Sequence, residues 1–174
     1  IQLANLFGAE VITTAGSEDK LRACYQLGAK FAINYKRQDF VTEISQFTEK
    51  KGVNVILDIV GGEYLNKNIS CLSEGGRLVQ IAFQKGMNAE VNLARVIFKK
   101  LTITGSALRP ASMEYKSEIA QQLFQNVWPL FSQGKIKIPI YRRFSLSQSA
   151  KAHQCLEKGE HIGKIMLDVI SDAK

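Results

Sequence analysis

The chain is organised around the stretch Val11-Ile-Thr-Thr-Ala-Gly-Ser-Glu-Asp-Lys20. Its β-branched and apolar residues predict a strand over residues 10–14 that is buried on both faces. Ser17 is a typical N-cap residue and predicts a helix whose third residue is Lys20. A strand that ends in a Gly-Ser turn and opens a helix can hold the ribose and phosphate of a nucleotide.

Strands and helices alternate along most of the chain, with short links between them. Apolar and β-branched runs predict further strands at residues 31–35, 53–60, 77–83 and 101–106. Apolar positions at helical spacing predict helices at residues 1–7, 17–27, 39–51, 64–72, 91–99 and 112–131. This alternation is typical of a parallel sheet with helices on both faces and right-handed crossovers.

The C-terminal part has a different texture. Residues 135–141 alternate in polarity and include Pro139, as expected of an edge strand. Beyond them we expect one more helix, which ends near Gly159, and a last strand at residues 164–170. The predicted organisation is therefore two parts, residues 1–133 and 134–174.

The composition is that of a globular protein with a moderate positive charge. The 174 residues are 45% hydrophobic and 22% charged, with a formal net charge of +7. The basic residues are scattered, which favours solvated helix ends and turns over a nucleic-acid surface. No apolar run approaches the roughly 18 residues that span a bilayer, so we expect no membrane segment.

The N-terminus and the cysteines predict a fragment of a protein from a reducing compartment. The first residue is Ile1 rather than methionine, the chain opens inside an apolar-periodic segment, and no signal peptide is recognisable. Three cysteines lie far apart, at positions 24, 71 and 155, without a CxxC motif or a Cys/His cluster. We expect free thiols, no structural metal and a cytoplasmic location.

Ligands of a doubly wound sheet bind beyond the carboxyl ends of its strands. Three of the four strand ends of this chain contain glycine, which either admits a ligand close to the backbone or only makes a tight turn. Both interpretations stay open for each glycine taken alone. The four ends are Thr14-Ala15-Gly16-Ser17, Val60-Gly61-Gly62, Ile81-Ala82-Phe83 and Gly105-Ser106.

The first of these ends discriminates between cofactors. A sheet that binds NAD usually ends this strand with Asp or Glu, which bonds the ribose hydroxyls. No acid stands there, whereas Ser17 can donate a hydroxyl and Lys20 can reach back over the turn. Together with the helix N-terminus, these groups favour the 2′-phosphate of NADP. The alternative is that Ser17 only caps the helix and Lys20 is solvated.

The residues do not define a catalytic acid–base set. His153 and His161 lie in the C-terminal part, where a satisfied or surface histidine is the expected role. The glycine-rich loop that would bind a pyrophosphate is missing too, because the chain begins in the helix that would follow it. No catalytic residue is therefore assigned.

Eight short segments together resemble the medium-chain dehydrogenase/reductase superfamily, and more narrowly its zinc-free quinone oxidoreductase branch. They run through the whole chain in the order and with the spacing of the family. The segments are Ile1-Gln-Leu-Ala, Gly8-Ala-Glu-Val-Ile-Thr-Thr-Ala-Gly-Ser-Glu-Asp-Lys20, Leu27-Gly-Ala, Ile33-Asn-Tyr35, Leu57-Asp58 with Gly61-Gly62, Gly75-Gly-Arg77, Ile103-Thr-Gly-Ser106 and His161-Ile-Gly-Lys-Ile-Met-Leu167.

The resemblance implies an α/β fold, a Rossmann-type doubly wound parallel sheet that lacks its first strand and glycine loop. Residues 1–133 would be this nucleotide-binding domain, and residues 134–174 would return to a GroES-like catalytic domain. The strand order 3-2-1-4-5-6 would make the missing strand the central one, so the strands at 10–14 and 53–60 would face an empty slot. The resemblance also implies a homodimer formed through the edge strand 101–106.

The activity implied by the resemblance is hydride transfer from NADPH to a quinone or an activated alkene (an enone), with the isolated fragment inactive. Two alternatives are an enoyl reductase unit of a fatty-acid or polyketide enzyme, and a nucleotide- or RNA-binding module without catalysis. No interleaving of aromatic and basic residues favours the RNA alternative. The resemblance places Gly16, Ser17, Lys20 and Tyr35 at the 2′-phosphate, Val60, Gly61, Ala82 and Phe83 at the adenosine and ribose, and Ser106 and Leu108 near the nicotinamide or the dimer edge.

Overall fold

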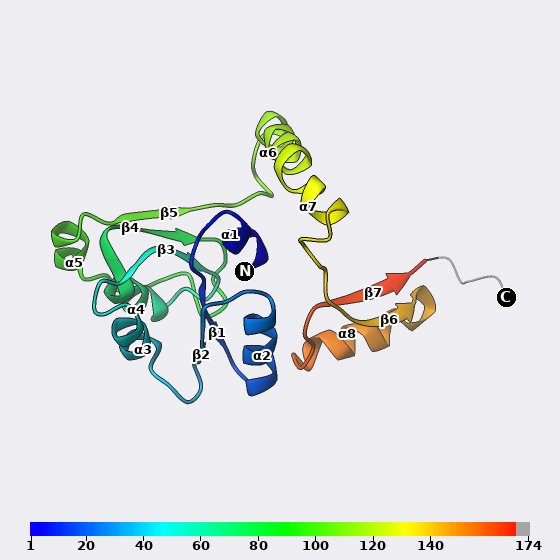
Figure 1. Cartoon of the computed structure of the whole chain (residues 1–174), viewed down its shortest axis with the longest axis horizontal. Helices are drawn as coiled ribbons and strands as arrows, with labels where there is room; N and C mark the ends of the chain where they lie inside the picture. Colours follow the sequence, from blue (N-terminus) through cyan, green and yellow to red (C-terminus); the bar gives the residue numbers. More distant parts are fainter. Residues whose placement is uncertain (170–174) are drawn as a thin grey trace. The chain divides into compact units, whose positions relative to one another are not determined.

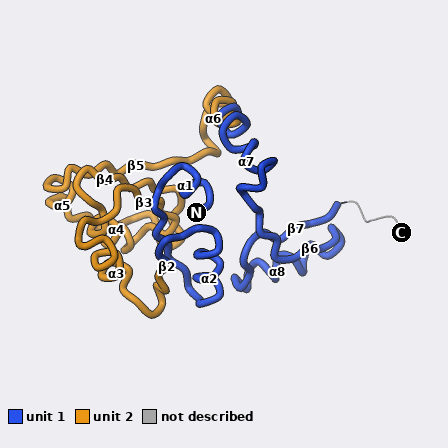
Figure 2. Tube along the Cα trace, viewed as in Figure 1, with its two compact units in different colours: residues 1–32, 121–174 blue, residues 33–120 orange. Residues whose placement is uncertain are grey.

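A computed structural model describes residues 1–169 of the chain (Figure 1). The chain divides into two compact units (Figure 2). The first unit contains residues 1–32 and 121–174, of which the last five lie outside the described residues, and the second contains residues 33–120. The predicted division into a nucleotide-binding domain at residues 1–133 and a segment of a catalytic domain at residues 134–174 stays a prediction.

The first unit begins with α1 (Gln2–Leu6), β1 (Ile12–Ala15) and α2 (Glu18–Gln26). Ser17 is the N-cap of α2, as predicted, and its hydroxyl oxygen accepts a hydrogen bond from the Lys20 amide. The prediction that this strand is buried on both faces is wrong, because only Ala15 is buried. The reason is that β1 pairs with a single strand, β2 (Phe31–Asn34), in a two-stranded sheet.

The second unit is a three-stranded parallel sheet with its helices. Its strands are β3 (Val53–Asp58), β4 (Leu72–Gln80) and β5 (Thr102–Gly105), in the order β3-β4-β5. Its helices are α3 (Phe40–Phe47), α4 (Tyr64–Cys71) and α5 (Leu93–Phe98). The helices α3 and α4 pack against each other (Figure 1). The buried apolar residues of this unit are Ile33, Phe40, Ile44, Ile69, Cys71, Leu72 and Leu78.

The strand β4 begins earlier than predicted. The sequence Gly75-Gly76 predicts a turn that leads into the strand, whereas both glycines lie inside β4. Val53 pairs with Leu72 and Val55 with Arg77, so the register slips between these two pairs. Extra residues on one strand of a pair are what a β-bulge inserts, and glycine in the left-handed region is common there. Gly75 has a φ of 70°.

The edge of β3 that faces away from β4 is unpaired in the described chain. Val55 and Leu57 on this strand are 62% and 66% exposed. A run of aliphatic residues such as this is typical of a parallel strand that is buried on both faces. Since β1 pairs only with β2 and β3 only with β4, no other pairing within residues 1–169 fills the predicted slot.

The single long helix predicted at residues 112–131 is two helices, α6 (Met113–Asn126) and α7 (Trp128–Ser132). They separate at Val127, whose φ of −110° departs from helical geometry. Pro129, at the start of α7, has no N–H to donate to the preceding turn, and this loss explains the break.

The C-terminal segment forms a second parallel pair, β6 (Ile140–Ser145) with β7 (Lys164–Asp168). The connection between them is a short 3₁₀ helix (Leu146–Gln148) followed by α8 (Ser149–Glu157). The strand predicted at residues 135–141 is therefore placed too early. Pro139 lies just before β6, and its carbonyl accepts from the Lys164 amide at 2.8 Å. The predicted end of the last strand, Ile170, lies outside the described residues.

Candidate cofactor site

The end of β3 is shaped by a buried carboxylate. Asp58 is 4% exposed, and its carboxylate accepts hydrogen bonds from the Val60 amide at 2.6 Å and the Gly61 amide at 3.2 Å. The Asn68 side-chain amide on α4 donates to the same carboxylate at 3.1 Å. Three N–H donors offset the cost of burying this charge, and they fix the turn that follows the strand.

The glycines of this turn are in contact with the chain's own backbone. Gly61 and Gly62 have φ angles of 68° and 56°, in the left-handed region. A Cβ atom on Gly61 would lie 2.7 Å from the Gly86 carbonyl oxygen, and one on Gly62 would lie 2.6 Å from the Lys85 carbonyl oxygen. Both glycines therefore make a tight turn that leaves room for the loop after β4.

The structure brings four of the predicted cofactor residues together at this edge of the sheet: Val60, Gly61, Ala82 and Phe83. The Lys85 amide donates to the Val60 carbonyl at 2.8 Å, and Gly61 lies against Phe83. The Gln80 side-chain amide donates to the Ala82 carbonyl at 2.6 Å. The Phe83 side chain is 54% exposed.

Ser106 joins the same edge through β5. Its amide donates to the Gln80 carbonyl at 3.0 Å, so the ends of β4 and β5 are level with each other. Leu108 lies further along the chain, where it is 56% exposed and outside any regular element. The carboxyl ends of the three parallel strands therefore share one edge, where a ligand of such a sheet is expected.

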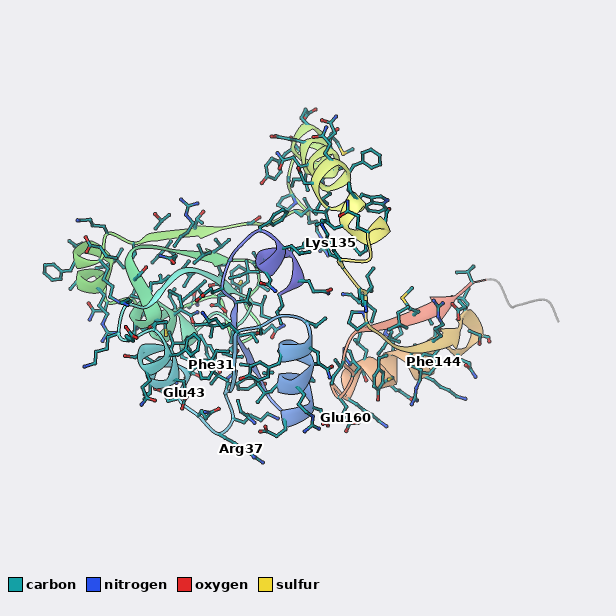
Figure 3. All side chains as sticks on the ribbon, viewed as in Figure 1. Phe31, Arg37, Glu43, Lys135, Phe144 and Glu160 are labelled. Carbon is teal, nitrogen blue, oxygen red and sulfur yellow. The ribbon has the colours of Figure 1, made fainter. Side chains whose placement is uncertain are left out.

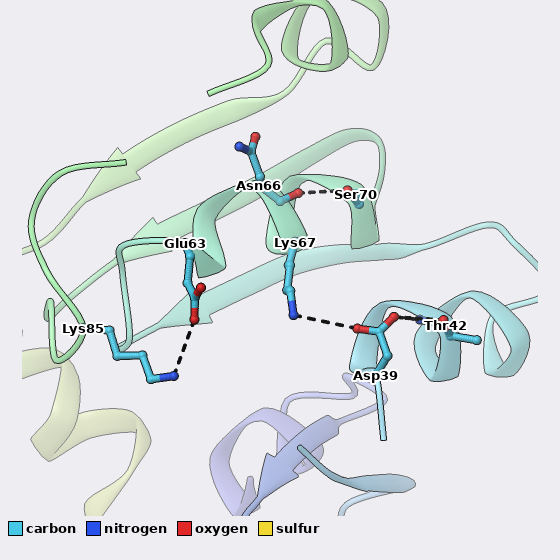
Figure 4. A network of polar contacts seen from close by, with 7 residues as sticks. All are labelled: Asp39, Thr42, Glu63, Asn66, Lys67, Ser70 and Lys85. Carbon is cyan, nitrogen blue, oxygen red and sulfur yellow. Dashed lines mark hydrogen bonds and ion pairs between the residues drawn. The ribbon is translucent and has the colours of Figure 1, made fainter. Parts of the chain in front are cut away.

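Two lysine–carboxylate pairs, Lys67 with Asp39 and Lys85 with Glu63, lie on the helices and the loop of this unit (Figure 4), and both lysines lie near an aromatic pair. The Phe40 and Tyr64 rings stack with centroids 5.5 Å apart, at the N-termini of α3 and α4. Lys67 Nζ lies 4.0 Å from Asp39, and Lys85 Nζ lies 3.6 Å from Glu63 and 5.0 Å from the Tyr64 ring centroid. Each ammonium thus has its own carboxylate, and neither lysine offers an unbalanced charge to a ligand.

The four residues predicted to bind the 2′-phosphate do not all belong to the same unit. Gly16, Ser17 and Lys20 come together in the turn from β1 to α2, within the first unit. The Lys20 ammonium is half-buried and donates to the Gly159 carbonyl, a contact that the sequence does not reveal. Tyr35 follows β2 in the second unit and is 44% exposed.

The thiols and imidazoles do not form a reactive centre. Burial is the main cause that raises the pKa of the Cys71 thiol to about 11, and burial also raises the pKa of Cys24. The His161 ring packs against Tyr141, and its Nδ1 atom is buried without a partner. Within residues 1–169 no three His, Cys, Asp or Glu side chains gather as metal ligands, and no helix is long and apolar enough to cross a membrane.

The parallel strands and their level carboxyl ends are those of a Rossmann-type fold. A family model described as zinc-binding dehydrogenase matches residues 1–126. The chain belongs to this family, and within the medium-chain dehydrogenase/reductase superfamily it is of the quinone oxidoreductase-like branch. The superfamily expected from the sequence is therefore confirmed.

Individual relatives cover nearly the whole chain. The 2-haloacrylate reductase of a Burkholderia species is 30% identical over 94% of this chain. The crystal structure of Escherichia coli quinone oxidoreductase complexed with NADPH superimposes on 97% of it, with a TM-score of 0.79 and 28% identity. The structure of CurK enoyl reductase covers 96%, with a TM-score of 0.75 and 26% identity. The chain spans about half the length of these three proteins, 49%, 52% and 50% respectively.

Proposed function

We propose that this chain belongs to an NADPH-dependent oxidoreductase that transfers hydride to a quinone or an activated alkene. The supporting observation is the turn from β1 to α2, which presents the Ser17 hydroxyl and the Lys20 ammonium and contains no carboxylate between Thr14 and Ser17. Both groups can donate to a phosphate, and neither is the carboxylate that usually accepts from the two ribose hydroxyls of NAD. The relative named as a 2-haloacrylate reductase and the neighbour solved with NADPH are consistent with this proposal.

The residues of the structure fit such a cofactor at two places. Ser17 and Lys20, with Gly16, would hold the 2′-phosphate, where the N-terminus of α2 adds a favourable dipole. Val60, Gly61, Ala82 and Phe83 already lie together and would flank the adenosine and ribose. Ser106 and Leu108 would lie near the nicotinamide or at a subunit edge. When bound, NADPH supplies the hydride, and no side chain of this chain is assigned a proton-transfer role.

Substitution of Lys20 tests the cofactor proposal in the full-length protein. A hydrogen bond to a charged group contributes about 1.5–3 kcal/mol, so Lys20→Ala should weaken NADPH binding roughly tenfold or more while NADH binding changes little. Nicotinamide fluorescence titration measures both dissociation constants. Lys30→Ala, which removes an exposed lysine paired with Glu10, is the matched control. An equal loss for NADPH and NADH would contradict the assignment of NADPH.

A second candidate is an enoyl reductase unit of a fatty-acid or polyketide enzyme. The fold of the chain favours it as much as the first candidate, because CurK enoyl reductase is among its structural neighbours. The two candidates differ in their acceptor. Turnover of the full-length protein with an enoyl thioester but not with a quinone would favour the enoyl reductase. Turnover with either acceptor would argue against a nucleotide- or RNA-binding module without catalysis.

We also propose that the full-length protein is a homodimer in which β5 pairs with its copy. All four residues of β5 are exposed, and the strand pairs only with β4 in the described chain. Leu93 and Ile97, one turn apart on the neighbouring helix α5, are 66% and 70% exposed. An exposed edge strand beside apolar side chains is a surface that native proteins cover.

The free thiols Cys24, Cys71 and Cys155 are in keeping with a reducing compartment such as the cytoplasm.

A further inference from the structure

Within residues 1–169, two polar contacts tie the C-terminal segment to the beginning of the chain, and both lie within the first unit. In one, the Gln2 side-chain amide donates to the Lys137 carbonyl at 2.8 Å and accepts from the Lys137 amide at 2.9 Å. In the other, the Lys20 ammonium donates to the Gly159 carbonyl. The first contact is neutral and reciprocal, so it needs no ligand. The second uses a charged group that the proposed function assigns to a phosphate.

The Lys20 ammonium can serve both partners at once. It has three N–H donors, and the contact with Gly159 occupies one of them. Gly159 follows the C-terminus of α8, where helix carbonyls present a partial negative charge that favours a cation. The lysine side chain loses rotamer freedom when it is held there, before any cofactor arrives. A side chain that is already ordered in the free protein loses less conformational entropy on binding, so it binds its ligand more tightly.

The backbone of Gly159 sets the direction of the carbonyl that Lys20 meets. Gly159 has a φ of 65°, and its amide donates to the Leu156 carbonyl at 3.0 Å, which closes the end of α8. No atom lies within 4 Å of a Cβ built on Gly159, so the conformation and not the space requires glycine. The next residue, Glu160, begins the turn that leads to β7 (Figure 3).

We propose that the Gly159 carbonyl is a positioning group for NADP(H): it holds the Lys20 ammonium over the turn from β1 to α2, and thereby links binding of the 2′-phosphate to the C-terminal segment. This inference rests on the proposed function, in which Lys20 binds that phosphate. Linkage is reciprocal. If the contact with Gly159 strengthens phosphate binding, phosphate binding stabilises the turn at residues 158–163.

Hydrogen exchange in the full-length protein tests this link. NADPH at saturation should slow the exchange of backbone amides in residues 158–163 by about threefold or more relative to saturating NADH, since only NADPH has the 2′-phosphate. Lys20→Met should abolish the difference, whereas Lys30→Met, at an exposed lysine paired with Glu10, should keep it. Fluorescence titration confirms the occupancy of each cofactor.

The outcomes of this experiment separate the inference from the proposed function. Bound NADPH that protects residues 158–163 no more than bound NADH overturns the inference and leaves the cofactor assignment intact. A protein that does not bind NADPH more tightly than its Lys20→Met variant overturns the proposed function, and the inference with it.

A pair of substitutions at Gly159 gives a second readout. Asn tolerates the left-handed region and Val does not. Gly159→Val should therefore raise the dissociation constant of NADPH by about fivefold more than that of NADH, whereas Gly159→Asn should change their ratio less than twofold. A Val variant in which both cofactors weaken equally would assign Gly159 a purely structural role, and the inference would fail.

Discussion

At the residue scale, the carboxylate of Asp58 determines where the proposed adenosine site lies. It is buried at the end of β3 and bonds the amides of Val60 and Gly61 directly. These two residues are among those proposed to flank the adenosine, so their position depends on a side chain that does not itself meet a ligand in this proposal. Asn68 holds the same carboxylate from α4, and it joins the helix to the turn.

The buried thiol of Cys71 gives the stability of the protein a dependence on pH. Its burial, aided by the negative charge of Asp39 and opposed by Lys99, raises the pKa of the thiol to about 11. A folded-state pKa above the unfolded value gives stability that is present at neutral pH and is lost as the pH rises. The free energy of unfolding of the full-length protein should therefore fall between about pH 9 and about pH 11.

Urea unfolding of the wild type and of Cys71→Ala over this pH range measures the effect. The variant removes the thiol, so the fall that belongs to Cys71 appears as the difference between the two pH profiles. Parallel profiles would show that the thiol titrates equally in the folded and unfolded protein.

At the scale of elements, the sequence correctly predicted those helix starts that depend on neighbouring residues alone. Ser17 and Asp39 cap α2 and α3 as expected, because an N-cap bonds amides two or three residues away. The start of β4 was predicted wrongly, since Gly75 and Gly76 look like a turn whereas pairing with β3 draws them into a strand. Local propensity gives way to tertiary pairing in such cases.

The candidate site shows the same division. The residues at the strand ends could be named from the sequence because the carboxyl ends of parallel strands meet at one edge. The contact of Gly61 with Gly86 and that of Lys20 with Gly159 could not, because each joins residues far apart in the chain and one partner is the backbone carbonyl of a glycine. Glycine gives no side-chain signal for such an approach.

The turn after β3 provides a test of this close approach. Gly62→Ala introduces a Cβ that would lie 2.6 Å from the Lys85 carbonyl oxygen, at a φ of 56°. Gly75→Ala is a matched control, because Gly75 has a φ of 70° and nothing within 4 Å of its Cβ position. A left-handed alanine costs about 1–2 kcal/mol in each variant. Gly62→Ala should lose about 1–3 kcal/mol more of the free energy of unfolding, by the cost of overpacking.

Urea unfolding of both variants of the full-length protein measures this difference. Equal losses would mean that the loop at residues 83–86 moves aside at no cost, and that its contact with the glycine pair does not shape the site.

At the scale of the whole molecule, the two unpaired edges of the β3-β4-β5 sheet have different characters. At one edge, β3 has two exposed aliphatic side chains, Val55 and Leu57, which point to a face of the sheet. The β5 edge is short and polar, with two threonines and a glycine around Ile103. A short edge strand of this kind suits pairing with a second copy, because backbone groups rather than a large apolar face make the contact.

Proline in β5 tests the proposed homodimer of the full-length protein. The Ser106 amide donates to Gln80 on β4, and amides alternate in direction along a strand, so the Ile103 amide points to the free edge. Ile103→Pro removes that donor without removing a bond to β4. We expect the variant to sediment as a monomer at a concentration where the wild type and Ile103→Val are dimers. Circular dichroism checks that the variant is folded, and a folded Ile103→Pro variant that stays dimeric would place the subunit contact elsewhere.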